Sequence, residues 1–350
     1  MASNWVWTMR DILAQRLRRQ RDRTSGFTLI ELLIAIIISG IIVLGLLSLV
    51  IEMVSVNRRE LARTETQRDM GIALEYMSSE LREAVYVYTG TCLGAGFGEE
   101  GEPNYCAGLF DGAGGLTAPD NSVPLIAFWK LDYLPEGCTN EVCDAYRVAG
   151  RAYKLVVYFL STDNPDGIWQ GPARLTRAEL GIESDGTLST GYVDPEGQFR
   201  SWESDGARLQ ADVLVDFVDL TPDPGGTDDG SYCPKEPIRY DITPALGSLE
   251  GEFDRVRSAY ACVRDDSQVA NTLSDELSDS TGSFNQKVVL FLRGNPGGRY
   301  GLDKRACSSV ADGGTLDADQ LRSEDNPCNL PTLKTEVLNR GVVNKKPRDL

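Results

Sequence analysis

The chain contains no histidine among its 350 residues. This absence excludes Ser-His-Asp and Cys-His catalytic arrangements, imidazole metal ligands and the side chain that most often acts as an acid or base at neutral pH. An enzyme built on this sequence would need unusual chemistry. We therefore predict a non-enzymatic protein without catalytic residues.

A long segment near the N-terminus lacks both proline and charge. No proline occurs between Phe27 and Glu102, and the twenty residues from Leu32 to Ile51 carry no charged side chain. Twenty apolar residues form a helix of the length that spans the hydrocarbon core of a membrane. No A-x-A-like cleavage site follows the apolar run, which argues against a cleaved secretory signal. An ordinary uncleaved anchor is an alternative, but it leaves Glu31 as an unexplained cost.

Basic residues are scarce beyond the start of the chain. The 35 basic and 52 acidic residues give a net charge of −17, while the first 26 residues hold six arginines and two aspartates, so they carry +4 and the remainder carries −21. Because the acidic remainder would repel phosphate backbones, no nucleic-acid partner is expected. The position of the arginines predicts that the leader stays in the cytoplasm and that the acidic body lies outside it.

Cysteine is absent from the leader and from the apolar run, and all eight cysteines follow them. An even number on one side of a membrane segment indicates disulfides in an oxidising compartment, with free thiols in a reducing compartment as the alternative. Sequence alone leaves the connectivity open. Proximity along the chain favours the pairs Cys92 with Cys106, Cys138 with Cys143, Cys233 with Cys262, and Cys307 with Cys328.

The string GFTLIELLIAI, which begins at Gly26, closely resembles the processing site of type IV prepilins and of the pseudopilins of type II secretion. The resemblance implies that a prepilin peptidase cuts between Gly26 and Phe27 and that the new N-terminal Phe27 is methylated. It also implies that Glu31 is the family's assembly glutamate. Physically, this carboxylate can pair with the α-ammonium of Phe27 on a neighbouring subunit, and two buried charges that are each costly alone become tolerable as a pair.

The segment that follows the apolar run predicts a continuation of the same helix. Apolar residues recur there at steps of three and four, which marks one apolar face: Met70, Ala73, Leu74, Met77, Leu81, Ala84 and Val85. We predict one helix from Phe27 to about Tyr88, the spine that the resemblance implies. A free two-stranded coiled coil is the alternative, although charges interrupt residues 57–69.

Beyond Thr89 the sequence changes to glycine, proline, cysteine and acidic loops between short apolar runs. The candidate strands are Leu125–Leu131, Tyr153–Leu160, Asp212–Leu220, Val256–Val263 and Lys287–Arg293. Long loops are expected at 89–123, 164–207, 221–253 and 294–350, and disulfides would pin them.

Together these features predict an α+β protein with the type IV pilin fold: a long N-terminal helix packed on an antiparallel sheet. The expected parts are a cleaved leader (1–26), a transmembrane and filament-core helix (27–51), an amphipathic stalk helix (52–89), an extracytoplasmic head with insertions (90–330) and a flexible tail (331–350). In size and arrangement the chain looks like the larger minor pilins of the PilW type and the J-type pseudopilin. It is also similar to the cyanobacterial pseudopilins linked to hormogonium polysaccharide secretion.

Several other sequence patterns resemble binding sites. The glycines Gly96, Gly98 and Gly101 match G-x-G-x-x-G, but no strand precedes them and adjacent glutamates would repel a pyrophosphate. Cys138 and Cys143 lack a second pair for zinc, and a local disulfide is favoured. Two acidic stretches offer oxygen ligands for calcium without matching an EF-hand: Asp223, Asp228 and Asp229, and Asp265, Asp266, Asp275 and Asp279. Three tryptophans are candidates for a sugar-stacking surface or for the core: Trp129, Trp169 and Trp202.

Three functional hypotheses follow. The first is a minor pilin or pseudopilin that primes or caps a type IV pilus or a secretion pseudopilus, supporting motility, adhesion or export. Its partners would be other pilins, the prepilin peptidase and the inner-membrane assembly platform, and its head would lie in the periplasm before assembly. The second is a filament-tip module that binds a polysaccharide, surface or secreted substrate. The third, an anchored enzyme, is disfavoured by the lack of histidine.

Overall fold

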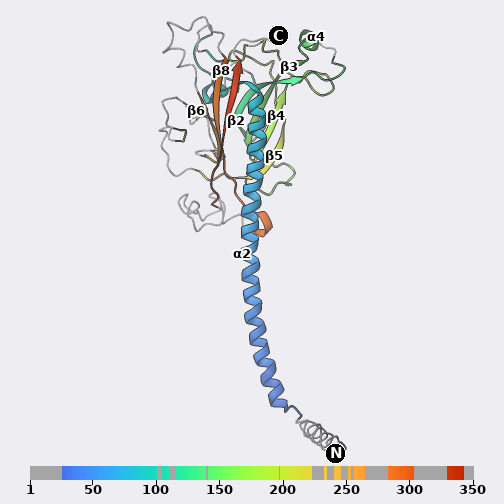
Figure 1. Ribbon diagram of the computed structural model, residues 1–350, viewed down its shortest axis with the longest axis vertical. Helices are drawn as coiled ribbons and strands as arrows, with labels where there is room; N and C mark the ends of the chain where they lie inside the picture. Colours follow the sequence, from blue (N-terminus) through green and yellow to red (C-terminus); the bar gives the residue numbers. More distant parts are fainter. Residues whose placement is uncertain are drawn as a thin grey trace, which may run out of the picture. The chain divides into compact units, whose positions relative to one another are not determined.

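The computed structural model describes residues 26–100, 105–110, 115–138, 141–196, 198–222, 232–234, 240–245, 251–253, 256–264, 283–302 and 329–342. The chain separates into two structural units, Met1–Asn57 and Arg58–Leu350. The described part of the first unit belongs almost entirely to helix α2 (Leu29–Glu83), whose C-terminal half is part of the second unit (Figure 1). We call the second unit the head. This α+β arrangement of a long N-terminal helix and antiparallel sheets agrees with the predicted type IV pilin fold.

Helix α2 ends earlier than the sequence predicts. Residues Ala84–Val87 form strand β1 instead of the last turn of a helix reaching Tyr88, so the predicted stalk helix 52–89 is too long by several residues. The run Ala-Val-Tyr-Val is rich in β-branched and aromatic side chains, which favour a strand. It pairs with strand β2, with Val87 opposite Phe128, and this pairing satisfies backbone groups that a helix would otherwise bond.

The first sheet has the strand order β1-β2-β3-β4-β5, and every neighbouring pair is antiparallel. Its longer strands are β2 (Ser122–Tyr133), β3 (Arg151–Ser161), β4 (Ala173–Leu180) and β5 (Ala211–Val218). Strands β2 and β3 each contain a predicted strand, and β5 overlaps the predicted strand Asp212–Leu220, which extends two residues too far. Strand β4 lies within the expected loop 164–207 and is not predicted by the sequence. Its sequence ARLTRAEL contains arginine and glutamate and few β-branched residues, so it lacks the composition typical of a strand.

The head also contains a second sheet, with the strand order β6-β7-β8-β9. The sequence predicts only one sheet, so the second is a difference from that expectation. Its strands are β6 (Tyr240–Thr243), β7 (Ala259–Arg264), β8 (Ser283–Leu292) and β9 (Leu333–Val342). Strand β9 pairs with β8 along its whole length. The predicted flexible tail 331–350 is therefore wrong for residues 333–342, whose strand is stabilised by pairing with a partner far away in the sequence.

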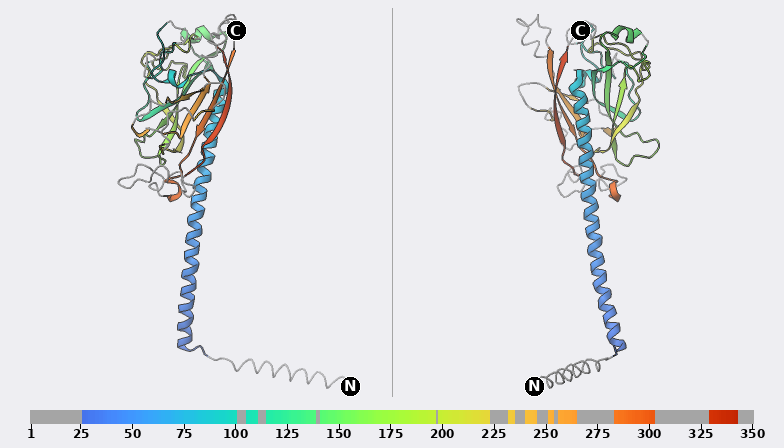
Figure 2. Two further views of the ribbon diagram at one scale, coloured as in Figure 1. Left: turned by 90° about the vertical axis from the view of Figure 1, so that its left-hand side faces the viewer. Right: turned by 45° about the vertical axis from the view of Figure 1, so that its right-hand side comes forward.

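One hydrophobic core joins the helix to both sheets. The buried face of α2 is the predicted apolar stripe, including Met70, Met77 and Leu81. This stripe packs in the same cluster as Phe128 of the first sheet and Leu290 of the second. Figure 2 shows this part of α2 running between the two sheets. Burial on two sides fixes the helix more firmly than packing on a single sheet would.

A second core lies on the other face of the first sheet, under the segments 89–121 and 181–210. Trp129 is at its centre, and its indole N–H donates to the Tyr88 hydroxyl at 3.0 Å. That hydroxyl donates in turn to the Phe199 carbonyl at 2.6 Å, and Trp202 packs edge-on against Trp129. These segments, predicted as loops, therefore bury a substantial aromatic cluster of their own.

Short helical segments complete the described part of the head. They are α3 (Gly90–Leu93), α4 (Glu141–Tyr146), and the 3-10 turns η1 (Gly251–Phe253) and η2 (Arg299–Gly301). Helix α3 lies against β6, so close that a Cβ atom added at Gly90 would lie 1.9 Å from the Ile242 carbonyl oxygen. Glycine is required here because any side chain would push the two segments apart.

Candidate functional site

The predicted processing site lies at the very start of α2. Gly26, Phe27 and Thr28 precede the first helical residue and are exposed, with the Phe27 side chain 82% accessible. Thr28 caps the helix, because its hydroxyl accepts a hydrogen bond from the Glu31 N–H at 3.3 Å and its carbonyl accepts one from the Leu32 N–H at 3.2 Å. The peptide bond between Gly26 and Phe27 thus lies in open, non-helical backbone.

Glu31 lies in the first turn of α2, surrounded in sequence by exposed apolar residues. Its position three residues after the Thr28 cap is favourable for a carboxylate, since the first turn of a helix carries partial positive charge. Within the described residues no ion-pair partner of Glu31 is present. The side chain is exposed. A carboxylate in this position can bind a cation brought by another chain.

The apolar part of α2 has no protein cover in this chain. Every large apolar residue from Leu29 to Val56 is at least 44% exposed. Among the described residues, α2 is the one helix long and apolar enough to cross a membrane, a judgement that rests on length and composition. So much exposed apolar surface calls for lipid or for other apolar helices.

The C-terminal end of α2 is joined to the first sheet by a buried ionic cluster around Glu80. The Glu80 carboxylate accepts hydrogen bonds from Arg177 Nε at 2.9 Å and Nη2 at 2.6 Å, and from Lys130 Nζ at 2.7 Å. The Tyr158 hydroxyl also donates to it. Its three partners come from β4, β2 and β3, so one helical side chain is bonded to three neighbouring strands.

The electrostatics of this cluster favour the charged form of Glu80. Burial by itself would raise the pKa of the carboxyl, but hydrogen bonds from Arg177, Lys130 and Tyr158 outweigh it and lower the pKa from 4.5 to about 2. The pKa of Arg177 is raised, because the hydrogen bonds of Glu80 and Glu179 outweigh its own burial. The cluster therefore remains ionised throughout the physiological range.

A second buried cluster joins the two sheets at the ends of β5 and β8. The Asp219 carboxylate accepts hydrogen bonds from Arg293 Nε at 2.8 Å, from the Asn295 side-chain amide at 3.0 Å and from the Thr221 hydroxyl at 2.7 Å. The same segments are also joined by backbone hydrogen bonds, one of which the Asp219 N–H donates to the Arg293 carbonyl at 3.1 Å. Because Asp219, Arg293 and Asn295 are all buried, the charges are fully partnered rather than solvated.

The turn after β8 also contacts α2 directly. Arg299 forms ion pairs with Glu65, at 3.5 Å, and with Asp69, and the Tyr300 hydroxyl donates to Glu65. The Arg299 guanidinium lies 4.3 Å from the ring centroid of Phe217. The start of the head's helical segment is therefore attached to the segment 299–300 by charged and aromatic contacts.

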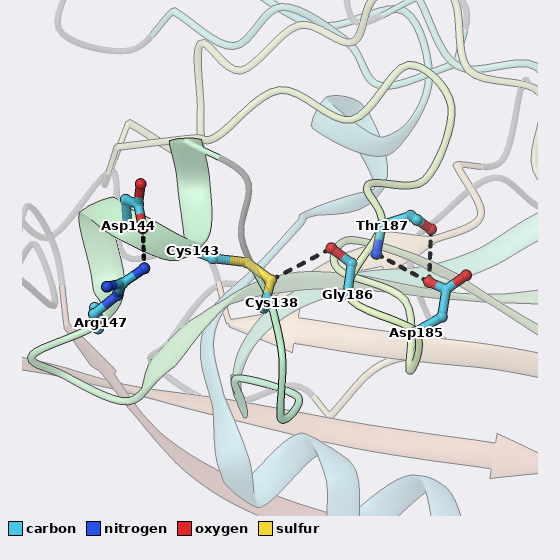
Figure 3. The surroundings of a disulfide bond; sticks show 7 residues. All are labelled: Cys138, Cys143, Asp144, Arg147, Asp185, Gly186 and Thr187. Carbon is cyan, nitrogen blue, oxygen red and sulfur yellow. Dashed lines mark hydrogen bonds and ion pairs between the residues drawn. A yellow bond between two sulfur atoms is a disulfide. The ribbon is translucent and has the colours of Figure 1, made fainter.

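Disulfides hold the long connections. The described residues contain the pairs Cys92–Cys106, Cys138–Cys143 and Cys233–Cys262, which are the pairs that chain proximity favours. Cys307 and Cys328 lie outside the described residues. Figure 3 shows the Cys138–Cys143 bond beside α4, with the Cys138 sulfur 3.4 Å from the Gly186 carbonyl oxygen.

That contact places the β2–β3 insertion, which carries α4, against the turn at 183–187. The turn is held by Asp185, whose carboxylate accepts hydrogen bonds from the Thr187 N–H and hydroxyl. On the exposed side of α4, Arg147 pairs with Asp144. The Cys138–Cys143 pair is thus a local disulfide within the β2–β3 connection, as the sequence favours over a zinc site.

Within the described residues, none of the other predicted binding patterns is brought together as a site. Gly96 and Gly98 flank Phe97, which forms an antiparallel bridge with Cys106, while Gly101 lies outside the described residues. The seven candidate calcium ligands also lie outside them, and no group of three metal-ligating side chains occurs in the part that is described. Trp129 and Trp202 are buried in the second core, and Trp169 lies apart from them, 38% exposed. The three tryptophans therefore make no common stacking surface.

Sequence reasoning missed the two ionic clusters. A signal for the first existed, because Glu80 is three residues after Met77 and so lies on the buried face of a helix, where most of the other members are apolar. A carboxylate in that position predicts a buried cationic partner. The identity of the partner could not be deduced, since Arg177 is 97 residues away and belongs to a strand that was not predicted.

Comparison with known proteins agrees with the N-terminal pattern. Residues 21–47 match the family model of the prokaryotic N-terminal methylation motif. No curated protein and no solved structure matches the chain. The matched segment includes Gly26, Phe27 and Glu31 and overlaps the start of the long exposed helix α2.

Proposed function

We propose that this protein is a minor pilin or pseudopilin that primes or caps the assembly of a type IV pilus or of a type II secretion-like pseudopilus. The observation that carries the proposal is the match of residues 21–47 to the methylation motif, which coincides with the start of an apolar helix without protein cover. Pilin-family proteins are structural subunits anchored in a membrane, and an exposed apolar helix serves both anchoring and assembly.

In this proposal a prepilin peptidase cuts between Gly26 and Phe27, and Phe27 becomes the methylated N-terminus. The open backbone before the Thr28 cap supports this step, because a peptidase needs extended, accessible chain at the bond it cuts. The new α-ammonium and the Glu31 carboxylate of an adjacent subunit then form an ion pair within a bundle of apolar helices. Since an unpaired charge is costly there, the pair selects one register for the incoming subunit.

The priming or capping role is supported by the size of the head. Two sheets, a second aromatic core and disulfide-linked insertions surround the end of α2, and such a head leaves little room for closely packed identical neighbours. We infer that the head lies in the periplasm before assembly and that the basic leader stays in the cytoplasm, as the charge asymmetry favours. The assembly platform of the inner membrane and other pilins are the expected partners.

The experiment that tests subunit identity is the mass of the N-terminal peptide of the protein isolated from membranes. We expect a peptide that begins with methylated Phe27, and we expect the Gly26→Ala variant to keep the leader. Gly40→Ala is the matched control, because Gly40 lies in the apolar helix and has open space around it, away from the cleaved bond. An intact Met1 leader in the wild-type protein would refute the proposal.

The role in assembly is tested separately. Deletion of the whole chain is expected to abolish or strongly reduce filaments, and quantitative mass spectrometry of purified filaments is expected to find far fewer copies of this chain than of the main subunit. Glu31→Gln should be processed normally but should not rescue the deletion. Abundance equal to that of the main subunit would contradict a minor, priming or capping role.

A further inference from the structure

Helix α2 begins immediately after Thr28, the second residue beyond the bond proposed for cleavage. The Thr28 hydroxyl accepts a hydrogen bond from the Glu31 N–H at 3.3 Å, and the Thr28 carbonyl accepts from the N–H groups of Glu31 at 3.0 Å and of Leu32 at 3.2 Å. A residue with non-helical backbone that makes these bonds is the N-cap of its helix. Gly26 and Phe27 precede this cap, so the bond between them lies outside the helix.

Several residues in this part of the sequence have the chemistry of an N-cap. Serine, threonine and glycine are all common at that position, and serine is at least as favourable as threonine. The four candidates are Thr24, Ser25, Gly26 and Thr28. Of these four, only Thr28 is followed three residues later by a glutamate or glutamine, Glu31, which is the pattern of a capping box. The pairing of Thr28 with Glu31 therefore selects this helix start over the alternatives upstream.

Loss of the Thr28 oxygen would favour a longer helix. The first N–H groups of a helix lack partners within it, and an unsatisfied N–H is costly where an exposed apolar helix such as α2 enters lipid. A helix extended upstream to Ser25, the next good cap, would bond these groups internally. Gly26 and Phe27 would then lie in its first turn. Because proteases cut exposed, irregular chain most readily, the bond would become a poorer substrate.

We propose that Thr28 is a positioning residue for processing, which as the N-cap of α2 keeps the bond between Gly26 and Phe27 in non-helical backbone for the peptidase. Glu31 then has a second task, which is to select Thr28 as the cap within one chain before assembly. The inference deepens the proposed function and depends on it, because it concerns the same cleavage. It agrees with the normal processing expected of Glu31→Gln, since glutamine also serves at that position of a capping box.

The test measures cleavage of the full-length chain in detergent micelles by the purified prepilin peptidase of the same cell. Initial rates over a range of chain concentrations are obtained from the mass of the N-terminal peptide. Thr28→Val removes the capping oxygen with little change in shape. We expect it to raise KM by about 2- to 30-fold, the factor in the helix-start equilibrium that corresponds to loss of an N-cap. The kcat should be unchanged, because only the non-helical fraction of the chain binds but that fraction is cut normally.

Two matched variants separate capping from direct contact with the peptidase. Thr28→Ser keeps a hydroxyl, and Thr28→Asn replaces it by a carbonyl oxygen, and both residues are good N-caps. We expect the wild-type KM for both. A KM for Thr28→Asn as high as that for Thr28→Val would show that the peptidase contacts the hydroxyl itself, and it would overturn the proposal. So would a wild-type KM for Thr28→Val, or a loss in Thr28→Val that is confined to kcat.

A structural control accompanies the kinetics. Thr28 belongs to the first structural unit and not to the head, so all three variants should keep the wild-type urea midpoint of the head, followed by tryptophan fluorescence.

The wild-type chain separates the two levels of the argument. If it is cut between Gly26 and Phe27 and Thr28→Val is cut with the same KM, the role of Thr28 is wrong while the proposed function stands. If the wild-type chain is not cut at that bond, the proposed function itself fails.

Discussion

The ionic cluster at the end of α2 permits a quantitative prediction. Replacing Glu80 by glutamine removes the charge that Arg177 and Lys130 neutralise, and leaves two half-buried cations against a neutral amide. The lowering of the Glu80 pKa from 4.5 to about 2 corresponds to ~3 kcal/mol of stabilisation of the charged form. Loss of one partner of a buried ion pair typically costs about 3–5 kcal/mol. We expect Glu80→Gln to lower the free energy of unfolding by about 3 kcal/mol.

The assay is urea unfolding of the full-length chain in detergent, followed by tryptophan fluorescence, because Trp129 is buried in the head. In thermal unfolding the same loss corresponds to a decrease in Tm of roughly 6–12 °C for a unit of this size. Glu75→Gln is the matched control, since Glu75 is exposed on the same helix. A change below about 0.5 kcal/mol for Glu80→Gln, as expected for a surface substitution, would refute the reasoning.

The same cluster predicts a pH dependence with a definite sign. Because the folded-state pKa of Glu80 is lowered, its contribution to stability is complete above the unfolded-state value of 4.5 and is lost as the pH falls from about 5 to 2. The stability difference between wild type and Glu80→Gln should therefore shrink over that range. A difference that stays constant down to pH 2 would show that Glu80 does not titrate as this cluster requires.

Other substitutions test other contacts of the head. Asp219→Asn should destabilise the head by about 3–5 kcal/mol, because it leaves the buried Arg293 guanidinium without its counter-charge; a loss below about 1 kcal/mol in urea unfolding would count against the tie between the sheets. Gly90→Ala should cost about 1–3 kcal/mol, since the new methyl would meet the Ile242 carbonyl oxygen. Its matched control, Gly71→Ala, lies mid-helix with open space around it and should stabilise by about 0.5–1 kcal/mol; the opposite order of these two glycine variants would refute the argument.

Local patterns predict most of the helix and its buried face, and they indicate a processing site at its start. Absence of proline and charge predicts the apolar part of α2, and the three- and four-residue spacing of Met70, Met77 and Leu81 identifies its buried face. The string from Gly26 to Glu31 indicates the processing site within six residues. Each of these signals depends on residues that are close together in the sequence. Periodicity and composition are therefore enough to predict them without knowledge of the tertiary structure.

Strands were predictable where their sequence is itself characteristic. The runs LVVYF in β3 and VVLFL in β8 are dense in β-branched and aromatic residues, and both were predicted. Strand β4 and strand β9 contain charged residues at many positions, and their extended conformation is set by pairing with β3 and β8. Such pairing is tertiary information, because a polar segment can be a strand, a helix or a loop according to what lies beside it.

The sequence by itself determined that this protein has a basic N-terminal segment, a membrane-length apolar run with Glu31 near its start, and a cysteine-bearing acidic body. Only the tertiary structure decided that the body forms two sheets around the end of the helix, that Glu80 bonds three strands, and that Trp169 and Tyr300 are exposed on segments flanking Phe217. The physical reason is the separation along the sequence of the residues that interact. Helix formation and membrane insertion depend on residues a few positions apart, whereas the partners of Glu80 lie 50 to 97 residues away and meet it only when the chain has folded.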